Sequence, residues 1–318
     1  MATLMLIGGS GFFGKSILDA YGRGLLSLWG VDKIIVIARS ANLLSTSHPN
    51  LINETITLLD QDIATASNLP DADFVIHAAA STDAANYLEN TQQEKLNIQS
   101  GILNYCKLAK KYHRNAKIIY CSSGAVYGQQ PADLDFLSEE NSFGDLKNIT
   151  PIKRDYAAAK RDAENAILGL AKSGLRVSIG RCFAFVGPYL PRDKHFAIGN
   201  FLNDGINGRP IVVQARHLVY RSYMYADDLV VWLMTLVNAA SVECKTINIG
   251  SDEAIDLGSL AIKIANYFQV PAEISSDTEG DIDRYVPSIR KAREELNLDI
   301  KFDLSSSIIE TVNASLKI

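Results

Sequence analysis

The strongest constraint on the fold is an alternation of short apolar runs with helix-like stretches over the first 188 residues. Such runs have the length and composition of buried strands, and strands that alternate with helices form a parallel sheet. We therefore expect an α/β fold with a doubly wound parallel (Rossmann-type) sheet. The expected strands are Leu4–Ile7, Lys33–Ala38, Thr55–Leu59, Phe74–Ala80, Lys117–Cys121 and Val177–Ile179.

The pattern changes after about residue 188, where loops lengthen and short strands and helices mix. We expect residues 1–188 to form a dinucleotide-binding domain. Residues 189–318 are expected to form mainly a smaller C-terminal substrate-binding lobe, with some segments returning to the sheet. The last helix signal is Ser288–Leu296, and residues 129–150 are polar and irregular, as expected of a loop.

A glycine-rich turn follows the first expected strand, and a helix is expected directly after it at Lys15–Tyr21. Gly8, Gly11 and Gly14 have a GxxGxxG spacing within GGSGFFG, which also contains Phe12 and Phe13. Glycines at this place allow a tight turn, a close approach to a pyrophosphate and close helix–strand packing. The N–H groups at the start of the helix can then hold phosphates, so the segment indicates a dinucleotide site, with an empty glycine turn as the alternative.

Three further segments could complete this cofactor site. The second expected strand ends in Arg39-Ser40, where NAD-binding proteins place an acidic residue, so a 2′-phosphate and NADP are favoured and NAD is the alternative. Asp62 could accept a hydrogen bond from an adenine amino group, with Ile63 packing on the ring. The fourth expected strand ends in Ala78, Ala79 and Ala80, and small side chains there let a flat cofactor lie across the strand end.

Tyr156 and Lys160 lie four residues apart in the alanine-rich run YAAAK. This spacing places both side chains on one face of a helix, about one turn apart. A lysine ammonium beside a phenol favours the phenolate, which makes the phenol a better proton shuttle near neutral pH. The ordinary alternative is a ring at the edge of the core beside a solvated charge.

Composition and charge exclude several other classes of function. The chain has 318 residues and a net charge of −5, so nucleic acid is not an expected partner. The four cysteines are scattered without metal-ligand spacing, and no metal site is expected. The N-terminus has no signal-peptide pattern and no run is long and apolar enough for a membrane helix. We therefore expect a cytoplasmic protein.

Four motifs in order then carry a family resemblance: GGSGFFG at 8–14, SSGAVYG at 122–128, YAAAK at 156–160 and RCFAFVGP at 181–188. The chain resembles the extended short-chain dehydrogenase/reductase family, in its nucleotide-sugar branch of epimerases, dehydratases and 4-keto reductases. The resemblance covers nearly the whole chain, since residues 220–228 and 291–296 also fit the branch.

The resemblance implies a role for each matching position. Ser123 matches the catalytic Ser/Thr, Tyr156 the acid/base, and Lys160 its partner, which also binds the nicotinamide ribose. Asn200 and Arg221 match residues that hold the sugar-linked diphosphate, and Arg284 is a weaker match in the same region. The implied substrate is a nucleotide-diphosphate sugar. A homodimer is also implied, in which the helix at about 92–112 and the Tyr156/Lys160 helix pair with their copies.

Two departures narrow the expected reaction. Sugar 4,6-dehydratases of the branch have acidic residues just after the catalytic Ser/Thr, where this chain has Gly124 and Ala125. Arg39 replaces the acid with which epimerases of the branch often hold NAD. Both favour an NADPH-dependent 4-keto-sugar reductase. A nucleotide-sugar 4-epimerase with an internally recycled cofactor, and a non-catalytic dinucleotide-binding regulator, are the alternatives.

Overall fold

The computed structural model describes residues 2–80, 84–194, 196–274 and 282–315. Contacts divide the chain into two compact units, and each is built from several stretches of sequence. The first unit comprises Met1–Val126, Ile149–Cys182 and Val230–Ile247. The second comprises Tyr127–Asn148, Phe183–Leu229 and Asn248–Ile318.

The first unit is built on a seven-stranded sheet, counted over the described residues, in the order β11-β6-β5-β4-β1-β2-β3. The adjacent strands from β3 to β6 pair in parallel, so the expected doubly wound parallel sheet is confirmed. The strands are β1 (Ala2–Ile7), β2 (Val31–Ala38), β3 (Ile56–Asp60), β4 (Phe74–His77), β5 (Lys117–Ser123), β6 (Arg176–Cys182) and β11 (Lys245–Ile249).

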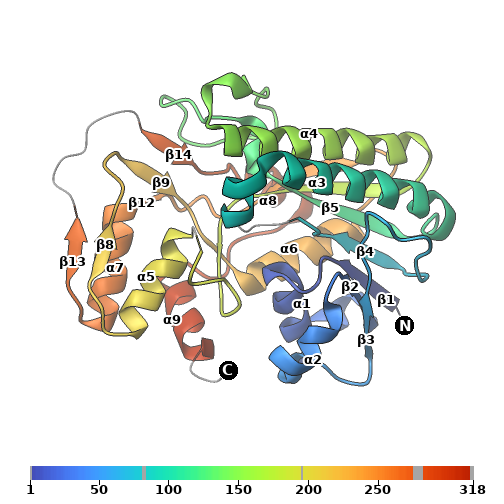
Figure 1. Ribbon diagram of the computed structural model, residues 1–318, viewed down its shortest axis with the longest axis horizontal. Coiled ribbons are helices and arrows are strands. Elements are labelled where there is room, and N and C mark those ends of the chain that lie inside the picture. The colour runs from blue at the N-terminus through green and yellow to red at the C-terminus, as the bar shows by residue number, and fades with distance from the viewer. Residues whose placement is uncertain (1, 81–83, 195, 275–281, 316–318) are drawn as a thin grey trace. The chain divides into compact units, whose positions relative to one another are not determined.

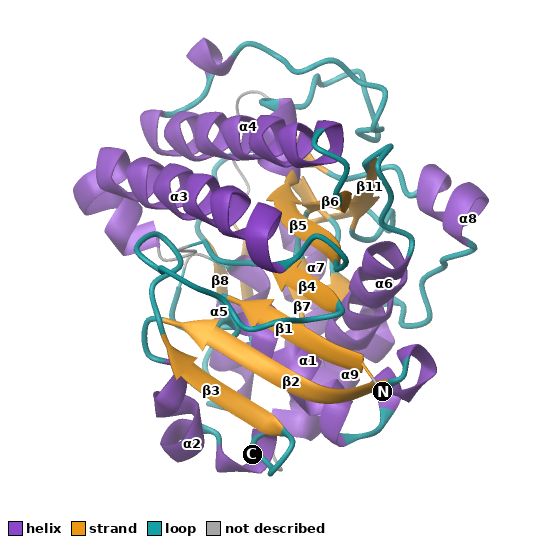
Figure 2. Cartoon of the chain, turned by 90° about the vertical axis from the view of Figure 1, so that its right-hand side faces the viewer, coloured by secondary structure: helices purple, strands orange, loops and turns teal. Residues whose placement is uncertain are grey.

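Helices cover both faces of this sheet. Helix α3 (Ala84–Tyr112) and helix α4 (Pro151–Lys172) run side by side (Figure 1) and cover one face, while α1 (Phe12–Gly22) covers the other (Figure 2). The core on the α3/α4 side contains Met5 and Ile7 from β1 and Ile102 from α3. The remaining helices of this region are the short α2 (Leu44–Ser47) and α6 (Ala226–Asn238).

Strand order reverses between β1 and β4, because β2 and β3 lie to one side of β1 and β5 and β6 lie beyond β4. Ligands of open parallel sheets bind at such a switch point, beyond the carboxyl ends of the strands. The glycine-rich turn follows β1 and the alanine run follows β4, so both segments lie at this point.

The second unit consists of short strands and helices. Its strands form a three-stranded sheet, β12-β9-β14, and the pairs β10–β7 and β13–β8. Strands β9 (Val219–Arg221) and β14 (Asp283–Tyr285) pair in parallel, while β12 (Ile255–Asp256) is antiparallel to β9. The other elements are β7 (Phe185–Val186), α5 (Ala197–Ile206), β8 (Ile211–Val213), β10 (Met224–Tyr225), α7 (Leu257–Phe268), β13 (Ala272–Ile274), α8 (Arg290–Leu296) and α9 (Leu304–Ser315).

Two sequence-based expectations about elements are wrong. The strand expected at Phe74–Ala80 ends at His77, because the alanines leave the sheet to pass close to the Gly8 backbone. The helix at Ser288–Leu296 is not the last one, since α9 follows it and buries Leu304, Ile308 and Val312. The irregular character expected for residues 129–150 is confirmed, apart from the single helical turn Leu146–Asn148, and helix α4 begins at Pro151.

Candidate active site

The glycine-rich turn has the geometry that a dinucleotide site needs. Gly8 has φ +85°, and a Cβ there would lie 2.6 Å from the Ala79 Cα, so only glycine fits. A Cβ on Gly14 would overlap the Gly9 carbonyl, which keeps α1 close to β1. Gly11 is the N-cap residue of α1 and has no side chain with which to cap the helix. The N–H groups at the start of a helix can bind a phosphate, so these residues fit a bound dinucleotide.

The carboxyl end of β2 is basic, as its sequence predicted. Arg39 and Ser40 are exposed there. Burial lowers the pKa of Lys15. Burial also lowers the pKa of His48, and the positive charge of Lys15 lowers the His48 pKa further. The acidic side chain of Asp60 at the end of β3 accepts hydrogen bonds from the Asn42 backbone N (2.8 Å) and Nδ2 (3.0 Å).

Asp62 and Ile63, the two residues predicted to contact adenine, both have contacts within the protein. An Asp62 carboxylate oxygen accepts a hydrogen bond from the Ala64 N (2.9 Å), which makes a local turn. The Ile63 side chain is buried in the core on the α3 side, and Asn104 donates to the Ile63 carbonyl (2.8 Å). The hydrogen bond from adenine to Asp62 and the packing of Ile63 on the adenine ring stay predictions.

Lys160 is the centre of the candidate acid/base group, although its side chain is almost fully buried. Its ammonium donates to the Cys121 carbonyl at 2.9 Å, two residues before Ser123 on β5. It lies 4.9 Å from the centre of the Tyr120 ring and 5.8 Å from that of Tyr156. The structure therefore brings the predicted Tyr156/Lys160 pair to the end of β5, where Ser123 lies.

The surroundings keep the Lys160 ammonium protonated. Burial by itself lowers the pKa of Lys160, but the phenols of Tyr120 and Tyr156 and the thiol of Cys121 outweigh it, and the net direction is upward. Tyr156 is half-buried and packs against Ile98 and Ala159. A fixed cation thus stands beside a phenol that is only partly covered.

Ser123 lies at the end of β5 and is buried, with its hydroxyl accepting a hydrogen bond from the Ala125 N (3.1 Å). Gly124 and Ala125 begin the single helical turn Gly124–Tyr127. Neither residue carries an ionisable group, so the chain supplies no acid or base at the two positions after Ser123.

A buried ion pair beside this group was missed by the sequence analysis. Glu164, on α4, receives hydrogen bonds from Arg181 and Ser122, and all three side chains are buried. The only sequence signal is that Glu164 follows Lys160 by one helical turn, while Arg181 opens the RCFAFVGP motif.

In the second unit, two predicted arginines lie on neighbouring strands. Arg221, on β9, pairs with Asp283 at 3.0 Å and has the Tyr285 ring 6.0 Å from its guanidinium. Arg284, on β14, stacks on the Tyr220 ring at 4.6 Å. The Arg284 Nε is buried and has no hydrogen-bond partner among the described residues. A buried donor without a partner is costly, which fits a place completed by an anionic ligand.

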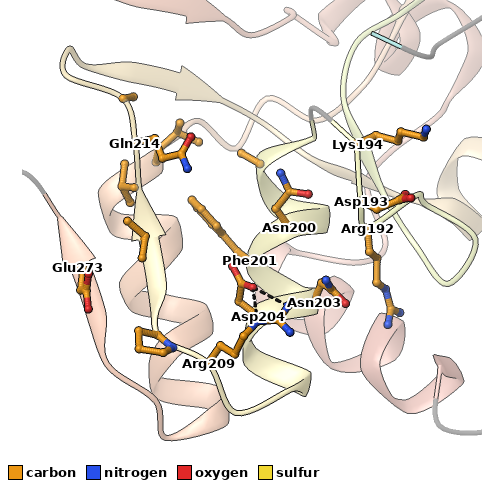
Figure 3. A pocket seen from close by; sticks show the side chains of 16 residues that line it. Arg192, Asp193, Lys194, Asn200, Phe201, Asn203, Asp204, Arg209, Gln214 and Glu273 are labelled. Carbon is orange, nitrogen blue, oxygen red and sulfur yellow. Dashed lines mark hydrogen bonds and ion pairs between the residues drawn. The ribbon is translucent and has the colours of Figure 1, made fainter. Parts of the chain in front are cut away.

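A cavity of about 790 Å³ lies within the second unit (Figure 3). Asn200, Phe201 and Asn203 enter it from α5, and Gln214 lies across from them (Figure 3). Among the described residues that line it, Asn200 is the one predicted from sequence, while Arg221 and Arg284 do not line it. The other lining residues are Arg192, Asp193, Lys194, Ala197, Asp204, Arg209, Pro210, Val212, Val213, Ala215, Leu257 and Glu273.

The described part of the chain contains no group of three or more His, Cys, Asp or Glu side chains that could hold a metal ion. No helix in that part is both long and apolar enough to cross a membrane.

Known proteins resemble the chain over nearly its whole length. A sequence profile of the NAD dependent epimerase/dehydratase family matches residues 4–250. UDP-glucuronic acid decarboxylase 1 of Arabidopsis thaliana is 28% identical over 98% of this chain and 69% of its own length. The protein of the same name from Xenopus tropicalis is 25% identical over 98% of this chain and 71% of its own length.

Solved structures share the fold at lower identity. UDP-glucose 4-epimerase of Thermotoga maritima, solved with UDP-glucose, superposes with a TM-score of 0.79 at 20% identity and covers 99% of both chains. dTDP-glucose 4,6-dehydratase of Bacillus anthracis, solved with NAD, gives 0.79 at 18% identity over 100% of this chain and 97% of its own. The profile match spans well over half of the chain, which therefore belongs to the NAD dependent epimerase/dehydratase family.

Proposed function

We propose that the protein is an NAD(P)-dependent oxidoreductase of nucleotide-diphosphate sugars. The observation that carries this proposal is the buried Lys160 ammonium, held by the Cys121 carbonyl beside the Tyr156 ring at the end of the strand that carries Ser123. A cation kept in this place favours the phenolate form of a neighbouring phenol. It suits Tyr156 for moving a proton to or from a sugar oxygen.

The proposed roles follow from these positions. The Tyr156 hydroxyl gives a proton to a sugar ketone oxygen, or takes one from the hydroxyl, while Ser123 donates a hydrogen bond that orients the same oxygen. Lys160 holds its charge beside the phenol throughout. The dinucleotide, which supplies the hydride when bound, would be held by the glycine-rich turn and the strand-end alanines. These residues are Gly8, Gly11, Phe12, Phe13, Gly14, Ala78, Ala79 and Ala80.

Net reduction by NADPH is the proposed direction. Loss of water from a sugar needs an acid for the leaving hydroxyl and a base for the neighbouring carbon, and Gly124 and Ala125 supply neither. A reductase needs one proton donor at one oxygen, which Tyr156 provides. We propose 4-keto sugars as substrates, and UDP as the first nucleotide to test, because the relatives described above act on UDP-glucuronic acid by name.

To test this, purified protein is incubated with NADPH and with UDP-, dTDP-, GDP- or CDP-linked 4-keto sugars. The loss of NADPH absorbance is measured, and the product is identified by NMR. We expect one substrate to give a 4-hydroxy sugar with one NADPH consumed per turnover. Interconversion of two 4-hydroxy sugars without NADPH consumption would assign epimerisation instead. No turnover with either class of sugar would leave a dinucleotide-binding regulator and reject the oxidoreductase.

NADP is proposed as the cofactor from the basic end of β2. Arg39 is exposed there, and the Asp60 carboxylate is already engaged by Asn42. Arg39→Asp should reverse the preference toward NAD, with NADPH affinity falling about tenfold, because a 2′-phosphate would meet a like charge. Fluorescence titration of both cofactors measures this. Tighter NAD than NADP binding by the wild type would contradict the assignment.

The substrate contacts and the dimer are proposed on separate grounds. Arg221, Arg284 and Asn200 are proposed to hold the sugar-linked diphosphate, since arginine pairs well with phosphate oxygens. Leu96 and Leu103 on α3 are exposed at 57% and 62%, and Leu168 on α4 at 38%, which supports pairing of these helices with a second copy. A monomeric mass in solution would contradict the homodimer.

A further inference from the structure

A buried hydrogen-bonded ion pair links helix α4 to strands β5 and β6. The Arg181 Nε and Nη2 donate to the two Glu164 carboxylate oxygens at 3.0 and 2.8 Å. The Ser122 hydroxyl donates to the Glu164 Oε1 at 2.6 Å. All three residues are buried. We call Ser122, Glu164 and Arg181 the Glu164 network.

The Glu164 network joins the three elements on which the candidate acid/base group depends. Glu164 lies one turn after Lys160 on α4, and that helix also carries Tyr156. Ser122 precedes Ser123 on β5, and Arg181 lies opposite Ser122 on β6. Helix α4 lies over β5 and β6 in Figure 2. These hydrogen bonds join helix α4 to the ends of β5 and β6. They therefore fix the distance between the part of α4 that carries Tyr156 and the backbone of Ser123.

The Glu164 carboxylate of the network places a negative charge near Lys160, and the Arg181 guanidinium neutralises that charge. Tyr120 illustrates its reach: burial raises the pKa of Tyr120 to about 12, Lys160 opposes this, and the Glu164 charge adds to it. Arg181 neutralises that charge through two hydrogen bonds. Among the described residues, ionisable groups on four elements interact with the Lys160 charge: His77 from β4, Tyr120 and Cys121 from β5, Cys182 from β6 and Tyr156 from α4. Glu164 and Arg181 lie beside these groups.

Stability alone is a poor reason for this pair. Taking two charges out of water costs nearly as much free energy as their attraction returns, and apolar residues of similar volume often serve the fold as well. A buried charge pair is better explained where it fixes a geometry or a local charge balance. The Glu164 network does both at the end of β5.

We propose that the Glu164 network is a positioning device for proton transfer. It holds Tyr156 and Lys160 in register with Ser123 and keeps Lys160 as the uncompensated charge beside the phenol. This inference rests on the proposed function, because it concerns the same reaction. Glu164, Arg181 and Ser122 act through Lys160 and Tyr156 and are positioning residues.

Glu164→Gln tests the proposal in the full-length protein. The amide keeps the size of the carboxylate but presents an N–H group to one Arg181 nitrogen and leaves the guanidinium uncompensated. We expect kcat to fall about 10- to 100-fold, with the KM for the sugar within about threefold of wild type. The pH–rate profile should move to lower pH by about 0.5–1 unit, because an added buried positive charge favours the phenolate.

A double variant separates charge from folding defects. Glu164→Gln/Arg181→Met removes the uncompensated charge, so its pH–rate profile should return to the wild-type position even if kcat stays low. NADPH affinity, measured by fluorescence titration, should stay within about twofold of wild type in both variants, which shows that the dinucleotide site is intact. If Glu164→Gln does not fold, the double variant with its neutral interior remains, and an altered pH profile in it contradicts the proposal.

Asp228→Asn is the matched control. Asp228 is also a buried carboxylate, and it accepts hydrogen bonds from the Lys301 and Phe302 backbone N–H groups in the second unit. Its variant should melt at lower temperature while the pH–rate profile is unchanged. A Glu164→Gln profile that matches wild type, or a shift that persists in the double variant, would overturn the proposal. A wild type without turnover on any nucleotide sugar overturns the proposed function and this inference with it.

Discussion

The charged groups of the two units are arranged differently. At the end of β5, the Arg181 and Glu164 side chains are 10% and 6% exposed, and both are fully paired within the protein. In the second unit, Arg221 and Asp283 are 22% and 33% exposed, while Arg284 reaches a largely exposed Asp135 at 3.3 Å. The Arg284 Nε has no partner among the described residues.

The difference matches the two roles that we propose for these groups. Groups that must hold a proton donor in place gain from being buried and fully paired, because little reorganisation remains when the reaction occurs. Groups that must grip a charged ligand gain from retaining unused donors, because the ligand then supplies the missing partner.

Tyr156→Phe should lower kcat about 10³-fold, because it removes the proposed proton donor while leaving the ring that packs against Ile98 and Ala159. NADPH binding should stay within about twofold of wild type. Tyr267→Phe, an exposed tyrosine in the second unit, is the control and should keep normal turnover. Near-normal turnover in Tyr156→Phe would show that Tyr156 is not the proton donor. The buried, paired groups of the first unit would then have no proton donor to hold in place.

Arg284→Leu should raise the KM for the nucleotide sugar about 30-fold with kcat little changed, because a group that binds ground state and transition state alike affects KM. Steady-state kinetics measure both constants. Arg290→Leu is the matched control. The Arg290 side chain is 66% exposed, and its ion pair with Glu140 is long, at 3.9 Å. An unchanged KM in Arg284→Leu would mean that the stacking on Tyr220 serves the fold alone.

His77 makes the first unit sensitive to acid. Burial lowers the pKa of His77 to about 3, the Lys160 charge adds to this, and neither ring nitrogen has a hydrogen-bond partner among the described residues. The folded state therefore needs the neutral ring, whereas the unfolded chain binds a proton below about pH 6.5. Its contribution to stability is complete above that pH and is lost progressively as the pH falls toward 3.

From these values, the free energy of unfolding should fall by about 2 kcal/mol between pH 7 and pH 5 through His77. His77→Leu should reduce the dependence on pH by that amount, since a leucine among the Tyr105 and Tyr120 rings has no proton to bind. Urea denaturation at the two pH values measures it. An equal loss of stability in wild type and variant would show that His77 is not the acid-sensitive group.

Much of the first unit could be predicted from short stretches of sequence. The apolar runs found strands β1 to β6 within a few residues, because a buried strand leaves a local apolar pattern. The strand expected at Phe74–Ala80 was too long, because close packing of Gly8 against Ala79 is a tertiary contact. Helix α9 was missed because its apolar residues are separated by serines and its packing partners lie far away in the sequence.

The candidate site divides in the same way. By itself the sequence determined the glycine-rich turn, the strand-end alanines and the Tyr156/Lys160 pair, since each depends on neighbours within about a helical turn. Only the tertiary structure decided that Lys160 is buried against the Cys121 carbonyl, that Glu164 joins Ser122 and Arg181, and that Arg284 stacks on Tyr220. Most of these partners stand far apart in the chain, and hydrogen bonds between buried groups form only where packing brings such residues together and excludes water.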